Sequence, residues 1–504
     1  MVVSGHSAAT LAGIAAFKRG GNLVDAMIAA SAALAAVVGQ ATSIGGDGFL
    51  LFQDGKTGRS IGLNASGVAP QAATPEKFPE GMNVHGPLAP VVPGLVRAWD
   101  EMHRRYGRLA WATLFDDAIA IAEAYPVSHS LAERAPAMQA RLAADPGCAE
   151  LYLPGGRPIA PGDALRQPAL AATLRMIAAQ GADAFYRGET AQRIAAFFET
   201  CGGLITASDL AAYAPLWVEP VATEFRGHRV EVMPPNSYGL LLLMQLNALA
   251  GLDAAKLTAD PARRAGYQMS ALKAAVAHGR RFIADPAAVP DAAAGLLSVE
   301  MTATLQQAVR EPASKQPVRN TGGTACVLIA DDEGNAVSLV QSVFNPFGAC
   351  LRDPATGILF NNRIQGFTHR PGEANSVGPG RRPAHTLCPV LVRRDGKLRF
   401  VLGTPGGISQ TLTIVQVLHQ LIEAGRDVAA AVDAPRWCNT RSGEFLIEPA
   451  FPQDAIAALA EMGHAARIAD DPYFYGSAKA VEILPSGTLA GAGDRHREAA
   501  ALGI

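Results

Sequence analysis

The sequence has little charge and few aromatic side chains. Only 17% of its 504 residues are Asp, Glu, Lys or Arg, and 43 basic residues against 45 acidic ones leave a formal net charge of −2. Nucleic-acid-binding proteins usually carry a basic excess, so this balance argues against that class. A hydrophobic fraction of 49% with so small a net charge also excludes intrinsic disorder. The length allows two to four domains, or one large α/β domain.

Several familiar catalytic and metal-binding patterns are also absent. The six cysteines form no pair with zinc-ligand spacing, so we expect no metal site and six free thiols in a reducing compartment; they stand at positions 148, 201, 326, 350, 388 and 438. The eleven histidines contain no HExxH set. No GxSxG elbow occurs either, so a Ser-His-Asp hydrolase has no support.

The sequence contains no pattern typical of a secretion signal or of a membrane-spanning helix. The start, Met1–His6, has no basic stretch and no apolar core of the kind found in secretion signals. Residues 26–46 carry no charge and have the length of a membrane span, but they are mostly Ala with Ser, Gln and Thr among them. We therefore expect a buried helix that runs into a loop, and a cytoplasmic protein without membrane contact.

Apolar periodicity predicts a mixed α/β protein. Helices are expected over 8–18, 24–38, 95–105, 111–124, 167–180, 189–198, 240–249 and 411–424. Strands are expected over 49–52, 60–63, 325–330, 335–343, 389–393 and 398–402, while 66–94 and 311–320 are expected to be irregular.

One junction has the residues of a self-activating nucleophile. A polar loop ends in Gly322-Gly323, and Thr324 opens an apolar strand. A Thr hydroxyl is a weak nucleophile, but cleavage of the bond before it would free an α-amine with a pKa near 8, able to act as its general base. The two glycines would permit the bent backbone that an N-to-O acyl shift needs. Spacing alone also allows Gly-Gly-Thr simply to start a strand.

Three further positions have two interpretations each. Gly406-Gly407 lies between a predicted strand and helix, where backbone N–H groups could form an oxyanion hole or an ordinary turn. Ser342, on the return strand of the Thr324 hairpin, could hydrogen-bond to Thr324 Oγ or face solvent. Asp47 could be a carboxylate within a site or a turn residue.

In these residues, Thr324, Ser342 and Gly406-Gly407, the sequence resembles the γ-glutamyltransferase (γ-glutamyltranspeptidase) family of N-terminal-nucleophile hydrolases. Similar segments occur in order along nearly the whole chain: Gly20–Ala26, Ile44–Phe49, Val92–Gly94, Gly202–Thr206 with Asp209, Leu210 and Tyr213, Pro234–Ser237, Asp332–Val337, Leu359–Asn362, Arg382-Pro383, Gly403–Gly407, Ala434–Arg436 and Asp494-Arg495.

The resemblance implies a four-layer αββα sandwich made from one precursor. Autocleavage between Gly323 and Thr324 would give a large subunit, 1–323, and a small subunit, 324–504. It implies Thr324 as nucleophile, Ser342 as its supporting hydroxyl, and Gly406 and Gly407 as the oxyanion pair. No metal or organic cofactor is implied. The partners would be a small-molecule amide and the enzyme's own two subunits, and a dimer of such heterodimers is allowed.

The amino-acid clamp of the family looks rebuilt in this sequence. The Arg that grips the glutamyl α-carboxylate aligns with Pro75, and the Asp that holds the α-amino group aligns with Gly366. The two adjacent serines near the site align with His385 and Thr386. Because a lost charge pair at such a clamp weakens binding, glutathione is not the expected main substrate.

The sequence looks closer to the family branch that includes oxamate amidohydrolases. Oxamate carries a carboxylate beside its amide, for which Arg363 and His385 are the candidate cations, unless Arg363 pairs with a protein carboxylate. Phe344, Asn345 and Thr386 complete the predicted substrate-binding set.

We therefore expect an autoprocessing hydrolase of small amides such as oxamate. Two alternatives keep the chemistry: a glutathione hydrolase/γ-glutamyltransferase with a different clamp, and a cephalosporin-acylase-like enzyme with a roomier, more apolar site. A third belongs to another class, a processing-dead binding or scaffold protein; the retained Thr324, Ser342 and glycine pair argue against it.

Overall fold

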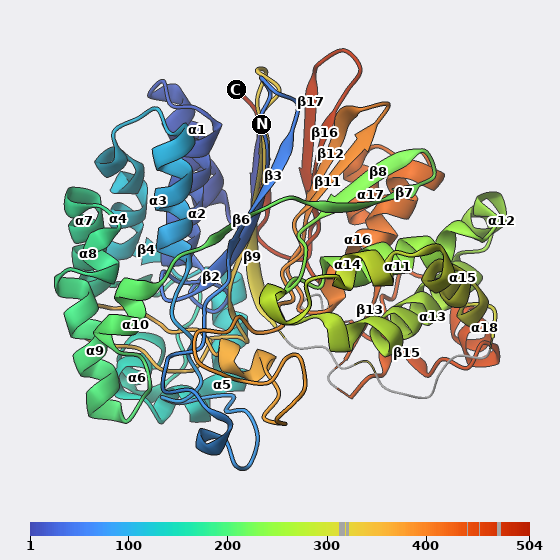
Figure 1. The fold of residues 1–504 in the computed structure, drawn as a ribbon. Coiled ribbons are helices and arrows are strands. Elements are labelled where there is room, and N and C mark those ends of the chain that lie inside the picture. Colours follow the sequence, from blue (N-terminus) through green and yellow to red (C-terminus); the bar gives the residue numbers. More distant parts are fainter. Residues whose placement is uncertain (312–317, 319–321, 441, 453, 471–474) are drawn as a thin grey trace.

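The chain folds around two β-sheets that lie face to face, with helices on the outer side of each (Figure 1). The computed structural model describes residues 1–504 except 312–317, 319–321, 441, 453 and 471–474. Helices, sheet, sheet and helices follow one another across the molecule, so the predicted αββα sandwich is confirmed.

Both sheets are antiparallel throughout. The first has the order β18-β1-β9-β10-β2-β3-β6, with strands β1 (Val2–Ser4), β2 (Asp47–Gln53), β3 (Ser60–Ala65), β6 (Leu216–Val218), β9 (Gly323–Ala330), β10 (Ala336–Phe344) and β18 (Ala500–Leu502). The second has the order β17-β16-β12-β11-β8-β7, with strands β7 (Val221–Phe225), β8 (His228–Val232), β11 (Val390–Arg394), β12 (Lys397–Gly403), β16 (Lys479–Ile483) and β17 (Leu489–Gly493).

The helices divide between the two sheets (Figure 1). On the side of the first sheet are α1 (Ser7–Lys18), α2 (Leu23–Val37), α3 (Leu95–Tyr106), α4 (Asp116–Glu123), α5 (His129–Ala143), α6 (Pro146–Tyr152), α7 (Pro168–Gln180), α8 (Asp183–Tyr186), α9 (Glu189–Cys201) and α10 (Ala207–Ala212). On the side of the second are α11 (Gly239–Ala250), α12 (Ala254–Ala259), α13 (Pro261–Gly279), α14 (Ala292–Leu296), α15 (Val299–Ala308), α16 (Ser409–Leu418), α17 (Val428–Asp433) and α18 (Ala455–Glu461).

Small residues let the first two helices pack closely against each other. Gly13 of α1 faces α2, where an added Cβ would stand 3.2 Å from the carbonyl oxygen of Ala26. The turn between the helices ends at Asn22, whose side chain accepts the backbone N–H groups of Val24 and Asp25 and starts α2 with a capping box. The abundance of Ala and Gly in the sequence is thus used for close helix packing.

Apolar side chains of the two sheets meet between them and form the central layer of the core. Cys326 and Leu328 of β9 pack there against Leu391 of β11 and Val401 of β12, and all four are buried. Successive strand residues point to opposite faces, so Thr324, two residues before Cys326, shares its face of the sheet. The start of β9 therefore brings Thr324 to the end of the inter-sheet layer.

The predicted helices and strands are confirmed within a few residues of their ends. Predicted helix 111–124 differs in starting as a 3-10 turn (Trp111–Phe115) before α4. Helix 411–424 is α16 followed by a π-helical turn (His419–Glu423). Most of the predicted loop 311–320 lies outside the described residues.

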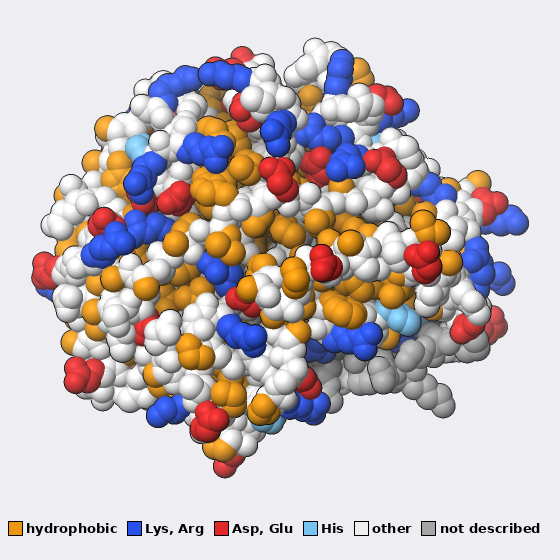
Figure 2. Space-filling view, in the orientation of Figure 1, with side chains coloured by type: hydrophobic (Ala, Val, Ile, Leu, Met, Phe, Trp, Pro, Cys, Tyr) orange, Lys and Arg blue, Asp and Glu red, His pale blue; other side chains and the backbone are white. Residues whose placement is uncertain are grey.

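Composition-based expectations can also be compared with the structure. All six cysteines are free, as predicted; five are buried as well, whereas Cys201, also expected to be buried, is partly exposed. In the part of the chain that is described, no helix is long and apolar enough to cross a membrane, and α2 ends at Val37 inside the uncharged run. Figure 2 shows basic and acidic side chains interspersed over one face, in keeping with the balanced charge.

Candidate active site

The predicted cleavage junction lies at the start of β9, beside the end of β10. Thr324 is buried, with 3% of its surface exposed. Ser342 is fully buried, so the alternative of a solvent-facing serine is wrong. Its Oγ accepts the Phe344 N–H at 2.7 Å and donates to the Gly323 carbonyl oxygen at 2.5 Å. The sequence suggested a bond from Ser342 to Thr324 Oγ; in the structure the hydroxyl donates to the carbonyl of the predicted cleavage bond.

The predicted oxyanion pair lies next to this junction. Gly406 and Gly407 connect β12 to α16 with φ angles of +133° and +59°, where glycine is favoured. Gly322 approaches them so closely that an added Cβ would stand 2.8 Å from Gly407 Cα and 3.0 Å from its nitrogen. In the uncut chain, the segment before Thr324 thus occupies the space in front of Gly407.

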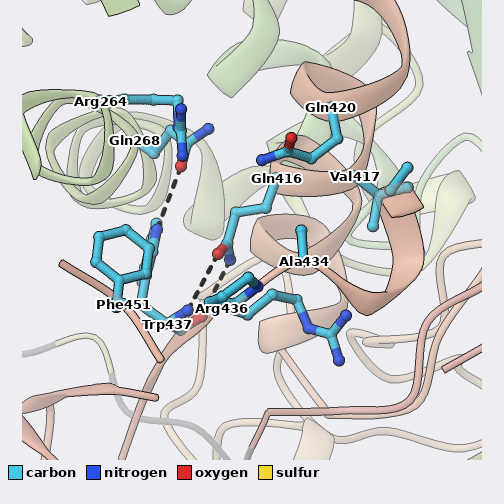
Figure 3. Close-up of a pocket in the computed structure, with 11 residues that line it drawn as sticks. Arg264, Gln268, Gln416, Val417, Gln420, Ala434, Arg436, Trp437 and Phe451 are labelled. Carbon is cyan, nitrogen blue, oxygen red and sulfur yellow. Dashed lines mark hydrogen bonds between the residues drawn. The ribbon is translucent and has the colours of Figure 1, made fainter. Parts of the chain in front are cut away.

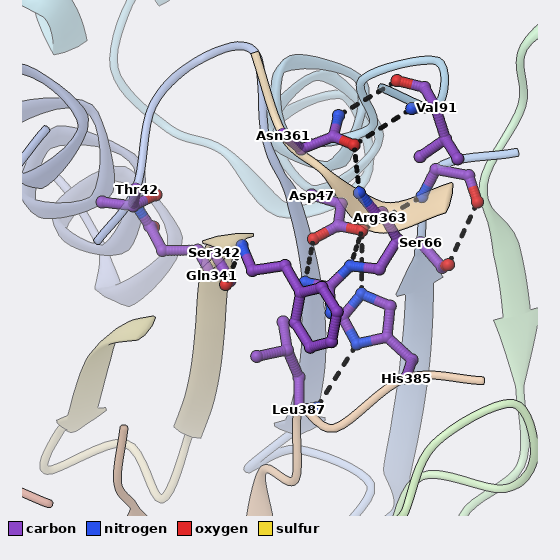
Figure 4. A network of polar contacts seen from close by, with 12 residues as sticks. Thr42, Asp47, Ser66, Val91, Gln341, Ser342, Asn361, Arg363, His385 and Leu387 are labelled. Carbon is purple, nitrogen blue, oxygen red and sulfur yellow. Dashed lines mark hydrogen bonds and ion pairs between the residues drawn. The ribbon is translucent and has the colours of Figure 1, made fainter. Parts of the chain in front are cut away.

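A fully buried charge network lies beside the Ser342 strand (Figure 4). Asp47 begins β2 directly opposite Ser342 in the sheet register. Arg363 donates to both Asp47 oxygens, from Nε at 3.1 Å and from Nη2 at 3.0 Å. His385 Nε2 lies 2.8 Å from Asp47 Oδ2. All three side chains are 0% exposed, and Asp47 is the first residue of a strand rather than a turn residue.

The network fixes the protonation of its members. Burial raises the pKa of Asp47, but Arg363 and His385 lower it by more. The net result is a pKa of about 2. Burial and the neighbouring Arg363 lower the pKa of His385 to about 4. His385 Nδ1 accepts the Leu387 N–H at 3.3 Å, so the neutral ring donates from Nε2 to Asp47. This geometry argues against His385 as a cation for substrate.

Two polar atoms near Phe344 have no hydrogen-bond partner among the described residues. They are Arg363 Nη1, a donor, and Asn345 Oδ1, an acceptor. The Arg363 guanidinium carbon stands 4.3 Å from the centre of the Phe344 ring. Asn345 is joined to the same region because its N–H donates to Asn362 Oδ1 at 3.0 Å. The structure thus brings together the predicted residues Phe344, Asn345 and Arg363.

Comparison with known proteins identifies the family. The Gamma-glutamyltranspeptidase family model matches residues 9–504. This chain belongs to that family. It is 34% identical to the oxamate amidohydrolase proenzyme of Klebsiella pneumoniae over 522 residues, covering 100% of this chain and 98% of that one. It is 33% identical to the acylase ACY 1 proenzyme of Pseudomonas sp. strain SE83 over 515 residues, covering 98% and 91%.

A solved structure extends the likeness to three dimensions. The cephalosporin acylase of Bacillus halodurans superposes with a TM-score of 0.90 at 31% identity, covering 99% of this chain and 94% of that one. Together these relatives make the chain an amidohydrolase of the γ-glutamyltranspeptidase family, with the N-terminal-nucleophile fold.

Gly366, which the resemblance aligns with an amino-binding Asp, has no room for a side chain in the structure. A Cβ on Gly366 would stand 2.7 Å from the Ala384 carbonyl oxygen and 2.9 Å from Pro383 Cβ. Pro75, at the other clamp position, begins a 3-10 turn (Pro75–Lys77). The backbone packing at Gly366 therefore excludes an Asp side chain at this position without movement of the chain.

A large cleft borders Gly366. Its volume is about 1330 Å³, and Tyr238, Gly366 and Ala384 line it close to His385. The other residues that line the cleft include apolar side chains as well as Arg280 and Arg281. The volume exceeds that of ordinary small-ligand pockets, about 300–1000 Å³, so the cleft offers room beyond a very small amide.

A second cavity, between α13, α16 and α17, has no such capacity (Figure 3). Its volume is about 10 Å³, enough for roughly one water molecule. Gln416 bridges the backbone N–H and carbonyl of Trp437, whose ring nitrogen donates to Gln268. These bonds show that the small cavity belongs to the packing between the helices and is not a substrate site.

Sequence reasoning left the partners of Asp47 unassigned and missed the network around Gln341. Gln341 Nε2 donates to the Ser31 carbonyl at 3.2 Å and to Thr42 Oγ1 at 3.0 Å on the helix side of β10. A signal for Asp47 was present: it is the single charged residue between the uncharged run 26–46 and an apolar strand. A lone charge in such surroundings needs a buried partner.

Alanine at Gly322 is expected to slow autocleavage about 100-fold. Gly322 has a φ of +141°, and the new methyl group would press on the Gly407 backbone; displacement of reacting groups by about 1 Å costs about this factor. The measurement is the half-time of cleavage followed by denaturing electrophoresis. Gly20→Ala is the matched control, because Gly20 also has a positive φ but nothing within 4 Å. Cleavage of Gly322→Ala at the wild-type rate would contradict the contact.

Proposed function

We propose that this protein is an autoprocessing amide hydrolase whose nucleophile is Thr324, with small carboxylate-bearing amides such as oxamate as acyl donors. The observation that carries the proposal is the Ser342 hydroxyl directed at the Gly323 carbonyl, 2.5 Å away, with Thr324 next in the chain. A hydroxyl in that position stabilises the negative charge that develops on this oxygen during attack.

Activation follows from the bonds at the junction. Thr324 Oγ attacks the Gly323 carbonyl carbon, the bond to the Thr324 nitrogen breaks, and that nitrogen takes up the hydroxyl proton. Water then hydrolyses the resulting ester, leaving a carboxylate at Gly323 and a free hydroxyl and α-amine at Thr324. Departure of the preceding segment clears the space in front of Gly407 for substrate.

Turnover uses the same residues in new roles. The α-amine of Thr324 takes the proton from its own Oγ as Oγ attacks the substrate carbonyl, and later passes it to the leaving nitrogen. The N–H groups of Gly406 and Gly407 stabilise the tetrahedral oxyanion. Water resolves the acyl-enzyme and restores Thr324; an amine acceptor would make the reaction a transfer.

Two features support a small amide with a carboxylate. Arg363 Nη1 and Asn345 Oδ1 are a donor and an acceptor on neighbouring segments that lack partners in the described part of the chain, matching a carboxylate oxygen and an amide N–H. The oxamate amidohydrolase proenzyme is one of the relatives named above. The pairing of Arg363 with Asp47 leaves this single N–H edge for substrate, so we assign it hydrogen bonding rather than full charge neutralisation.

One observation favours a second candidate, an acylase for bulkier amides. The cleft of about 1330 Å³ beside Gly366 is large and partly apolar. The relatives from Pseudomonas sp. and Bacillus halodurans are named acylases. This candidate keeps Thr324 and the glycine pair and differs only in the group that the cleft receives.

The test combines cleavage mapping with a substrate panel. From a chain of 52.4 kDa, we expect fragments of about 34 and 19 kDa in proportion to their lengths, the smaller beginning Thr-Ala-Cys-Val. Oxamate, a γ-glutamyl anilide and an N-aryl-acyl amide of cephalosporin size are then compared by kcat/KM. Preference for the bulky amide would favour the acylase, and preference for the anilide would restore a γ-glutamyl enzyme. A permanently uncut, inactive chain would favour the scaffold alternative.

A further inference from the structure

The backbone is strained where β10 ends. Phe344 has a φ of +80°, in a region that bulky L-residues rarely adopt. It stands at a register shift, because β10 and β9 pair regularly up to Gln341 and again only at Phe344, opposite Gly323. Strain of this kind persists only where the surrounding structure enforces it, and it is concentrated at functional sites.

The Asp47–Arg363 pair supplies the enforcing contact. The guanidinium lies over the Phe344 ring at 4.3 Å, a distance at which a cation attracts an aromatic face. Two hydrogen bonds to Asp47 fix the plane of the guanidinium. Because both charges are fully buried, solvent does not weaken this arrangement.

The conformation of Phe344 in turn sets the direction of the Ser342 hydroxyl. The Phe344 N–H donates to Ser342 Oγ, so that oxygen uses one lone pair as an acceptor and has its proton free to donate. The proton goes to the Gly323 carbonyl oxygen. Were Phe344 to relax to an ordinary φ, its N–H would turn and the hydroxyl would lose this orientation.

We propose that the buried Asp47–Arg363 pair is a positioning device for autocleavage, acting through Phe344 on the hydroxyl of Ser342. The inference rests on the proposed function, since it concerns the same Gly323–Thr324 bond. Neither Asp47 nor Arg363 exchanges a proton or an atom in the step. They hold the donor that stabilises the Gly323 oxygen while the bond from Thr324 Oγ forms and the peptide C–N bond breaks.

The experiment measures the half-time of cleavage in precursors made by cell-free synthesis and sampled on denaturing gels. Arg363→Lys keeps the charge but loses the planar fork, and Phe344→Leu keeps bulk but loses the ring. We expect each to lengthen the half-time at least tenfold, whereas Phe344→Tyr, which keeps the ring face, stays near wild type. Arg393→Lys is the matched control: Arg393 forms a buried pair with Glu231 at 3.0 Å at the end of β11.

A double-mutant cycle separates positioning from a merely structural role. If the pair acts through Ser342, Phe344→Leu adds little further slowing in a Ser342→Ala precursor. Ser342→Cys, with a weaker donor, is a second background and is expected to retain measurable cleavage.

Three outcomes overturn the proposal: unchanged cleavage in Arg363→Lys and Phe344→Leu, equal slowing in Arg393→Lys, or the same slowing by Phe344→Leu in the wild-type and the Ser342→Ala precursors. An uncut wild-type chain would instead refute the proposed function itself.

Discussion

Replacing Thr324 by alanine is expected to leave a single chain of 52.4 kDa and to abolish amide hydrolysis. The variant has no Oγ to attack the Gly323 carbonyl, so neither the acyl shift nor the free α-amine can form. Losing the nucleophile of such a site costs on the order of 10⁶ in kcat, which is beyond the range of a routine assay. Intact-mass analysis after prolonged incubation measures the cleavage, and the amide panel measures the activity.

Two variants make this result specific. Thr324→Ser keeps a hydroxyl at the same position and is expected to cleave, at a lower rate. Thr304→Ala removes an exposed threonine on α15 and is expected to behave as wild type. Complete cleavage of Thr324→Ala at the Gly323 junction would show that another group carries out the reaction.

Removing the Asp47 carboxylate is expected to destabilise the fold by about 3–5 kcal/mol. Asp47→Ala leaves the fully buried Arg363 charge without its partner, and an uncompensated charge of this kind has a cost of about that size. The measurement is urea unfolding of the uncut Thr324→Ala precursor, so that one chain unfolds. Asp332→Ala, at an exposed position on the β9–β10 turn, is the control and is expected to change stability by less than about 0.5 kcal/mol.

A partner substitution tests the cause of that loss. In Asp47→Ala/Arg363→Met both charges are absent, and stability is expected to recover part of the difference, because a buried pair can be replaced by apolar groups at small cost. Loss in the double variant equal to the sum of the two single losses would mean that the charges are not coupled.

The same network predicts loss of stability in acid. The unfolded chain protonates His385 near its ordinary pKa of about 6.5, whereas the folded chain does so only near 4. Between these values the unfolded state binds more protons, so stability falls as pH drops from 6.5 to 4. Asp47 acts in the same direction lower down: its contribution is complete above about 3.8 and is lost as pH falls toward 2. A flat stability profile between pH 6.5 and 4 would contradict a neutral, buried His385.

Local features of the site could be predicted from the sequence, whereas their arrangement in space could not. The Gly323–Thr324 junction, the Ser342 strand and Gly406-Gly407 could be predicted because each depends on a short pattern: glycines before a strand, alternating apolar residues, and a turn before a helix. Their proximity could not be derived from pattern, and the family resemblance supplied it. The bond from the Ser342 hydroxyl to the Gly323 carbonyl was not predicted, because it depends on a register shift between β9 and β10 that leaves no mark in residue type.

The pairing of charged residues far apart in the chain could not be predicted from the sequence. Asp47 and Arg363 are separated by 316 positions in the chain, and nothing local to either residue indicates the other. The structure shows that Arg363 pairs with a protein carboxylate, Asp47, while its Nη1 has no partner among the described residues. It also made His385 a neutral hydrogen-bond donor, whereas the sequence offered it as a cation.

The sequence by itself determined the mixed α/β content, because periodicity is a property of neighbouring residues, and the ordered motifs shared with the family determined the family and, through the resemblance, the layered sandwich. Only the tertiary structure decided which distant groups are in contact. The Ser342 hydroxyl donates to the Gly323 carbonyl, Arg363 pairs with Asp47, and Gly366 packs against Ala384. These relations are set by strand register and packing between distant segments, and desolvation in the interior then fixes which groups remain charged.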